Sequence, residues 1–271
     1  MTTQPQSFIP TKRALLDYEG YVFDLDGTLY LGPVLIEGIA PMLENLRSLD
    51  KAIRFLSNKP LQTRQDYAAK LRSLGVDAED DQVINSSAVV TRYLLDHHSG
   101  CRPYVLGEAP LLGELVAAGF SLATCSADCD LLLLSFDRDF SYRKLHEAML
   151  AAKTGVPIIA TNPDVTCPTE SGEIPDCGAI IAAVEACSGR EVDVIVGKPS
   201  RIMMEVILKD LGLPAGEVLL VGDRLETDMK MGLDAGMATA LVLTGVTSPQ
   251  AAAGCPAQPD YILASAAAIA P

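Results

Sequence analysis

The chain has 271 residues, of which 49% are hydrophobic and 21% charged, so it can bury a core and is not disordered by composition. Its 21 Lys and Arg stand against 35 Asp and Glu, and the formal net charge of -14 disfavours nucleic acid and anionic membranes as partners. Since the sequence shows no secretion signal, no apolar run of membrane-spanning length and no CxxC pair, we expect a soluble, reduced, cytoplasmic protein.

Short apolar runs alternate with helical patterns along the chain. Buried strands are predicted at residues 20–23, 52–56, 193–196, 218–221 and 239–243. Amphipathic helices are predicted between them, for example at 39–48 and 200–211. Continuous apolar strands separated by helices are typical of a parallel sheet covered on both faces. The sequence therefore predicts an α/β fold with a doubly wound parallel sheet.

A long insertion interrupts this pattern. About 140 residues separate Ser57 from Lys198, and ordinary element lengths account for about 40 of them. The remainder is long enough for a domain. We expect a second, inserted α/β domain at 86–188 and a discontinuous core domain at 11–85 and 189–271. Within the insertion, strands are predicted at 103–106, 131–136 and 158–161, and helices at 111–118 and 142–153. The Ala-rich stretch 264–270 predicts a short surface helix.

The motif Asp24-Leu25-Asp26-Gly27-Thr28 directly follows the first predicted strand. Alternation along a strand sends the side chains of Asp24 and Asp26 the same way. Two carboxylates so close together repel each other unless a cation lies between them or one is protonated. An Asp-Gly turn closing a hairpin is the structural alternative, and it explains Gly27 but not the paired acids.

Three further motifs follow predicted strands. Ser57 and Asn58 can bind a phosphoryl oxygen near a helix start, or can simply cap that helix. Lys198 lies between a strand and a helix, where it adds positive charge or is solvated. Asp223 and Asp228 offer hard oxygen ligands that suit Mg²⁺, or act as helix caps.

The four motifs become informative when they are taken together. All of them lie at the carboxyl ends of predicted parallel strands or at the adjacent helix starts, where open α/β sheets bind ligands. The set supplies acids for a metal, a nucleophile, a second acid for proton transfer, a hydroxyl group and a lysine. This combination predicts phosphoryl transfer.

The order DLDGT (24–28), SN (57–58), GKPS (197–200) and GDRLETD (222–228) resembles the haloacid dehalogenase (HAD) superfamily of phosphatases. The large insertion resembles the class with a C2-type cap domain. Within that class, the chain is similar to the NagD-like, AraL-like and p-nitrophenyl phosphatase-like enzymes. The resemblance implies a HAD core, which is Rossmann-like, carrying an inserted α/β C2-type cap.

The resemblance also implies roles for the acidic residues. Asp24 is expected to be the nucleophile and a Mg²⁺ ligand. Asp26 is expected to be the general acid/base, to contact the substrate and to offer its backbone carbonyl to the metal. Asp223 is expected to ligate Mg²⁺, with Asp228 assisting directly or through water.

The resemblance implies that the remaining polar residues bind the phosphoryl group. Ser57 and Asn58 are expected to bind it, and Lys198 is expected to bind it as well and to orient Asp24. Lys59 departs from many relatives, which have a neutral residue there. Its charge near the pocket mouth either alters the leaving-group preference or points to solvent.

The cap is expected to exclude water and to read the leaving group. Candidate specificity residues are Asn162 and Asp164, in a segment that continues to Cys177, although an ordinary loop after a strand is an equal alternative for any one residue. Relatives often pair through their caps, so the resemblance implies a homodimer.

The predicted function is that of a Mg²⁺-dependent phosphatase, a HAD-type phosphoric monoester hydrolase. Its expected substrate is a small phosphorylated metabolite, such as a sugar phosphate or a nucleoside monophosphate, and its expected intermediate is an aspartyl-phosphate. The alternatives are a phosphomutase and a non-catalytic metabolite-binding protein on the same fold. A dehalogenase needs no Mg²⁺ site, and a dinucleotide-binding enzyme needs a GxGxxG motif that is absent here.

Overall fold

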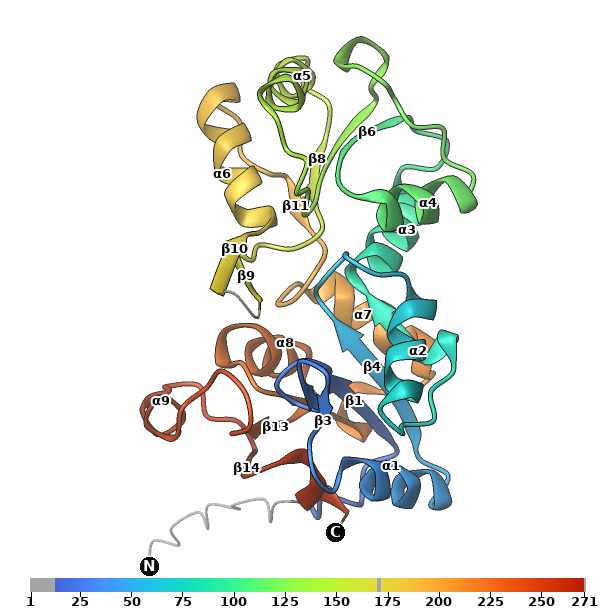
Figure 1. The fold of residues 1–271 in the computed structure, drawn as a ribbon, viewed down its shortest axis with the longest axis vertical. Helices are drawn as coiled ribbons and strands as arrows, with labels where there is room; N and C mark the ends of the chain where they lie inside the picture. The colour runs from blue at the N-terminus through green and yellow to red at the C-terminus, as the bar shows by residue number, and fades with distance from the viewer. Residues whose placement is uncertain (1–12, 170–171, 271) are drawn as a thin grey trace, which may run out of the picture.

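The computed structural model describes residues 13–169 and 172–270, which form two parallel sheets flanked by helices (Figure 1). A six-stranded sheet has the order β14-β13-β12-β1-β4-β5, and a four-stranded sheet has the order β11-β8-β7-β6. Every neighbouring pair in both sheets is parallel. The predicted α/β fold is confirmed. No helix in the described part of the chain is both long and apolar enough to cross a bilayer.

The six-stranded unit, at the bottom of Figure 1, contains both ends of the described chain. Its strands are β1 (Gly20–Asp24), β4 (Ala52–Ser57), β5 (Val83–Asn85), β12 (Val218–Gly222), β13 (Ala238–Val242) and β14 (Tyr261–Leu263). Its helices are α1 (Ile39–Ser48), α2 (Arg64–Ser73), α3 (Ser86–His97), α7 (Arg201–Leu211), α8 (Lys230–Ala235) and α9 (Pro249–Gly254). Shorter elements are the hairpin strands β2 (Tyr30–Leu31) and β3 (Val34–Leu35) and the helical turns η1 (Asp80–Gln82), η3 (Ala215–Glu217), η4 (Leu225–Met229) and η5 (Ala266–Ile269).

The four-stranded unit, at the top of Figure 1, lies between the two halves of the first unit in sequence. Its strands are β6 (Pro103–Leu106), β7 (Leu131–Leu134), β8 (Ile158–Ala160) and β11 (Val194–Ile195). Its other elements are α4 (Ala109–Ala117), α5 (Tyr142–Lys153), α6 (Cys177–Ser188), the turn η2 (Ser126–Asp128) and the antiparallel hairpin β9 (Thr166–Thr169) and β10 (Gly172–Pro175).

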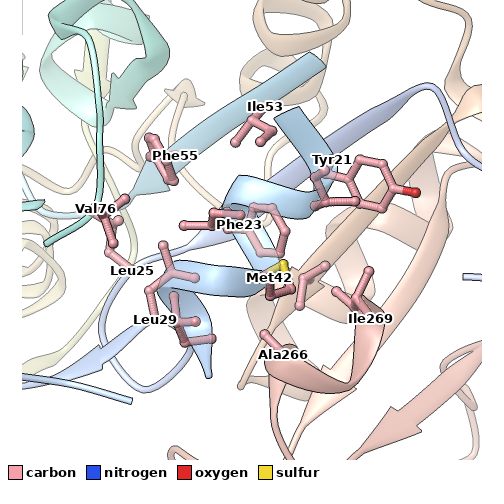
Figure 2. Packing of buried hydrophobic residues seen from close by; sticks show 14 of the residues in the cluster. Tyr21, Phe23, Leu25, Leu29, Met42, Ile53, Phe55, Val76, Ala266 and Ile269 are labelled. Carbon is pink, nitrogen blue, oxygen red and sulfur yellow. The ribbon is translucent and has the colours of Figure 1, made fainter. Parts of the chain in front are cut away.

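Strand β1 shows why the six-stranded sheet is covered on both faces. Tyr21 and Phe23 point to one face and pack in the cluster that contains residues of α1 and α2 (Figure 2). Val22 points to the other face and packs with residues of α3 and α7. All three side chains are fully buried, and burying each stabilises the fold by about 1.5–3 kcal/mol. This double burial fixes the strand at the centre of the sheet.

One predicted strand of the six-stranded sheet belongs to the other sheet. The strand expected at 193–196 forms as β11, but it pairs with β8. The four-stranded sheet therefore reaches beyond residue 188, while α3, which follows residue 85, packs against α7 of the six-stranded unit. Apolar character alone could not tell the two sheets apart. The domain division at 86–188 stays a proposal, and this pairing favours a second boundary after Ile195.

The Ala-rich tail was expected to be a short surface helix; a short 3-10 helix does form, but one side of it is buried. Residues 266–269 form the short turn η5, in which Ala266 and Ile269 are buried. Figure 2 shows both side chains beside Met42 of α1. The tail has no polar side chain beyond Ser265 to favour water, so it packs onto the apolar face of α1 instead.

Candidate active site

Three neighbouring strands of the six-stranded sheet end at the same edge. Asp24 is the last residue of β1, Ser57 is the last residue of β4, and Asp223 directly follows β12. Because β12, β1 and β4 are adjacent and parallel, their carboxyl ends bring these three side chains together. The sequence motifs that carry them therefore converge, as the strand pattern predicted.

Lys198 is buried between two of the predicted acids. Its Nζ lies 2.5 Å from Asp24 Oδ1 and 2.8 Å from Asp228 Oδ1. The lysine enters from the other unit, since it follows β11 and precedes α7. Ser200 caps that helix by accepting a hydrogen bond from the backbone N–H of Ile202. This N-cap hydrogen bond fixes the start of α7 and therefore the position of Lys198, which precedes the helix.

The backbone around Asp228 brings its side chain back to the end of β12. Asp228 lies in the π-helical turn η4, and its Oδ2 accepts a hydrogen bond from the backbone N–H of Arg224 (3.3 Å). The carboxylate packs so closely on Gly222 that a Cβ added there would overlap it. Glycine at the end of β12 therefore makes room for the buried acid.

Asp24, Asp223 and Asp228 form a cluster that suits a divalent cation. One carboxylate oxygen from each lies within 4.8 Å of the others, and all three residues are buried. Asp223 Oδ2 accepts a hydrogen bond from the backbone N–H of Val246 (2.7 Å), but its buried Oδ1 has no partner in the described part of the chain. Buried oxygens without partners are costly, and Mg²⁺ binds such oxygens. The residues present therefore fit a magnesium ion.

The ionisation of this cluster reflects its crowding. Burial raises the pKa of Asp24 to about 7, with repulsion from Asp228 and Asp223 opposing the attraction of Lys198. Burial and Asp228 also raise the pKa of Asp223. Although burial disfavours the ammonium group of Lys198, Asp228 and Asp24 hold its pKa above the ordinary value. Three carboxylates thus share one cation, and a second cation would relieve their repulsion.

Asp26 differs from Asp24 in its surroundings. Its side chain is 41% exposed, and its Oδ2 accepts a hydrogen bond from Lys59 Nζ (3.0 Å). Gly27 after it adopts a left-handed φ of 85°, and a Cβ there would come within 2.6 Å of Asp223. The turn after β1 therefore requires glycine, and it leaves Asp26 partly exposed beside Lys59. Lys59 does not simply point to solvent but pairs with this acid.

Asn58 joins the two units of the molecule. Its Oδ1 accepts a hydrogen bond from the backbone N–H of Lys198 (2.8 Å), and its Nδ2 donates to Asp164 Oδ2 (2.6 Å). The backbone carbonyl of Asn58 accepts from Asn162 Nδ2 (3.1 Å) and from Ser86 Oγ (2.8 Å). Both candidate specificity residues thus contact Asn58. The Asn58 side chain also fixes the backbone at Lys198 relative to Asp164.

A pocket of about 60 Å³ lies between the two units. Its lining includes Asp24, Asp26, Ser57, Asn58, Lys59, Asp164 and Lys198. Asn162 anchors the wall without lining the pocket.

Comparison with known proteins places this arrangement in a family. A family model described as haloacid dehalogenase-like hydrolase matches residues 21–121, and a second, described as HAD-hydrolase-like, matches residues 195–269. Sugar-phosphatase AraL from Bacillus subtilis is 37% identical over 246 residues, which cover 91% of this chain and 90% of that protein. The chain belongs to the haloacid dehalogenase-like hydrolase family.

Solved structures of HAD proteins agree with the whole fold. A 4-nitrophenylphosphatase from Thermotoga maritima superposes with a TM-score of 0.89 at 37% identity, covering 93% of this chain and 97% of that chain. NagD from E. coli K-12 gives a TM-score of 0.86 at 32% identity, with coverages of 92% and 97%. The predicted HAD core with an inserted C2-type cap is confirmed, and so is the predicted enzyme class, a HAD-type phosphoric monoester hydrolase. The four-stranded unit is the cap.

Five residues that line the HAD pocket were not singled out from the sequence. They are Thr166, Cys167, Asp176, Arg224 and Thr227. The first three lie in the cap segment that was expected to contact the leaving group. Nothing in the sequence of that segment distinguishes the residues that line the pocket from their neighbours. Burial raises the pKa of Asp176 to about 6, and Thr227 Oγ1 is buried without a partner among the described residues. The Thr227 hydroxyl is therefore available to a ligand, whereas Asp176 Oδ1 already accepts from the backbone N–H of Cys177.

Proposed function

We propose that this HAD enzyme is a Mg²⁺-dependent phosphatase that hydrolyses a small phosphomonoester through an aspartyl-phosphate. The supporting observation is the position of Lys198, whose Nζ contacts both Asp24 and Asp228 beside the unpartnered Oδ1 of Asp223. A buried lysine beside three clustered acids is costly for a fold and suits the binding of an anionic phosphoryl group together with a cation. The relatives named sugar phosphatase support a sugar phosphate or a similar metabolite as substrate.

Asp24 is the proposed nucleophile. An oxygen of its carboxylate attacks phosphorus in line, forming the P–O bond of the aspartyl-phosphate as the ester P–O bond breaks. Asp26, two residues on and more exposed, donates its carboxyl proton to the leaving alkoxide. Its carboxylate then takes a proton from the attacking water. Water oxygen bonds to phosphorus, inorganic phosphate leaves, and Asp24 returns as a carboxylate.

The remaining residues balance charge and orient the groups. Lys198 holds the Asp24 carboxylate and neutralises phosphoryl oxygens, and Ser57 Oγ is the proposed hydroxyl donor to them. Asp24, Asp223, Asp228 and the backbone carbonyl of Asp26 would hold the metal. When bound, Mg²⁺ would neutralise part of the charge of the cluster and of the phosphoryl group, which favours the ionised form of the nucleophile.

The test is release of inorganic phosphate from p-nitrophenyl phosphate and from a panel of sugar phosphates and nucleoside monophosphates. Turnover is expected with Mg²⁺ and is expected to cease in excess EDTA. Asp24→Asn should abolish turnover and the acid-stable, base-labile phosphoenzyme. Asp234→Asn, an exposed acid on α8, is the matched control and should retain activity. Undiminished turnover in EDTA or in Asp24→Asn would contradict the proposal.

The same assay separates the two alternatives. A phosphomutase would move the phosphoryl group within the substrate and release little phosphate. A non-catalytic metabolite-binding protein would bind a phosphorylated ligand without turnover. The C2-type cap favours hydrolysis over a phosphomutase, and the presence of every acid and the lysine of the HAD motifs favours catalysis over simple binding.

Three further predictions belong to this proposal. Asn162 and Asp164 are proposed to act in specificity, Asp164 from the pocket wall and Asn162 through Asn58. A homodimer formed through the cap and a cytoplasmic location are also proposed, and sedimentation and cell fractionation would test them.

A further inference from the structure

A larger pocket adjoins the catalytic pocket on the side of Asp26. It has a volume of about 440 Å³ and lies between the β2–β3 hairpin and the loop after β13. Asp26, Lys59 and Arg224 line both pockets, so the two spaces meet at the proposed acid. The catalytic pocket is much the smaller of the two, at about 60 Å³, and suits the phosphoryl group better than a bulky leaving group. The outer pocket has the room that the leaving group needs.

The charges that line the outer pocket favour an anion. Arg224 forms no salt bridge in the described part of the chain, although its positive charge partly offsets the raised pKa of nearby Asp223. Lys59 forms an ion pair with Asp26, whose proton the reaction needs. The other acid, Asp223, has its Oδ2 bound to the N–H of Val246. An anion entering here meets two cations, while both acids of the lining have a proposed task in the reaction: Asp26 as proton donor and Asp223, whose Oδ1 has no partner among the described residues, as a Mg²⁺ ligand.

The rest of the outer wall is uncharged. It consists of Gly27, Leu31, Gly32, Thr244, Gly245 and Val246. Leu31 and Val246 are 53% and 65% exposed, so the pocket is open to solvent at its rim. A short carbon chain can lie against these groups while its charged end reaches the two cations.

The cap wall has the opposite character. Asp164 and Asp176 line the catalytic pocket from the cap, and Asp164 is held there by Asn58 Nδ2. A second negative charge on the leaving group would be repelled by these carboxylates and attracted by Lys59 and Arg224. The charge distribution therefore directs an anionic leaving group outward.

We propose that Lys59 and Arg224 form an anion subsite for the leaving group, and that the preferred substrates are small phosphomonoesters with a second anionic group, a carboxylate or another phosphate. The inference rests on the proposed phosphatase function. It gives Lys59 a specificity role beside the proposed acid, Asp26.

The test compares matched substrates. 3-Phosphoglycerate and glycerol 3-phosphate differ by a carboxylate in place of a hydroxymethyl group, and fructose 1,6-bisphosphate and fructose 6-phosphate differ by one phosphate. The wild-type enzyme should favour the anionic member of at least one pair by about tenfold or more in kcat/KM, the scale of a charged hydrogen bond. The pair that shows the preference identifies the second anion.

Variants assign the preference to the two cations. Lys59→Met and Arg224→Met should each reduce the preference ratio by about tenfold, mainly through a higher KM for the anionic substrate. Lys59→Arg should keep most of the ratio. Lys230→Met removes an exposed lysine outside both pockets and should leave the ratio unchanged.

Two results would overturn the inference. One is a wild-type enzyme that hydrolyses both members of each pair equally well. The other is a Lys59→Met enzyme that loses activity equally on both members, which would mean that the lysine acts through Asp26 alone. Failure to hydrolyse p-nitrophenyl phosphate as well would refute the phosphatase function itself, and the subsite with it.

Discussion

Replacing the proposed nucleophile should make the metal-free protein more stable while it abolishes activity. Asp24 is buried beside two other carboxylates, and Lys198 compensates only part of their charge. Asp24→Asn keeps the size of the side chain and an oxygen that can accept from Lys198, but removes the charge. The stability of the fold and the chemistry of the site therefore oppose each other at this residue.

The size of the effect follows from the pKa of Asp24, which burial raises from 3.8 to about 7. Between these pH values the folded protein keeps a proton that the unfolded chain has released, so its stability falls as pH rises. This loss of stability is complete above about pH 7, where Asp24 is ionised in the folded protein as well. At about 1.36 kcal/mol for each pH unit, the charge costs about 4 kcal/mol there.

The assay is urea or thermal unfolding of wild type and Asp24→Asn in EDTA from pH 5 to pH 8.5. At pH 8 the variant should be more stable by up to about 4 kcal/mol, or about 10 °C in Tm. The difference should shrink by about 1.4 kcal/mol for each pH unit below 7. Mg²⁺ at a hundred times its Kd should stabilise the wild type by about 2.7 kcal/mol and the variant less.

Asp234→Asn serves as the control, because its acid is exposed and paired with Lys230 on the surface. It should change stability by less than about 0.5 kcal/mol at every pH. If Asp24→Asn were no more stable than wild type above pH 7, or if the difference did not vary with pH, the reasoning about the acidic cluster would be refuted.

Other substitutions test the packing and charge of the site. Lys198→Met should lower kcat by about 10²–10³-fold in phosphate release and destabilise the fold by about 3–5 kcal/mol, since it leaves buried acids uncompensated; near-normal kcat would contradict this. Gly222→Ala should cost about 1–3 kcal/mol and weaken Mg²⁺ binding by calorimetry, because its Cβ would displace Asp228; unchanged binding would count against the close contact. Leu134→Ala, in the middle of the cap sheet, should cost about 2–5 kcal/mol in urea unfolding, and a smaller loss would mean that the cap core relaxes around it.

The candidate site could be predicted from sequence because its main residues follow strands. Asp24, Ser57 and Asp223 each come directly at the end of an apolar run, and parallel strands gather such residues at one edge. The outer pocket was invisible in the sequence. Arg224 lies next to a predicted metal ligand, yet only the fold of the β2–β3 hairpin and the loop after β13 makes a pocket around it.

The sequence by itself determined the alternation of strands and helices, the length of the insertion and the order of the four motifs, because these depend on local apolar patterns and residue chemistry. Only the tertiary structure decided that β11 joins the cap sheet, that the Ala-rich tail packs beneath α1, and that Lys59 pairs with Asp26. Those outcomes depend on which distant surfaces meet. An apolar strand can pair with several strands and a charged side chain with several opposite charges, and only the folded chain selects one of them.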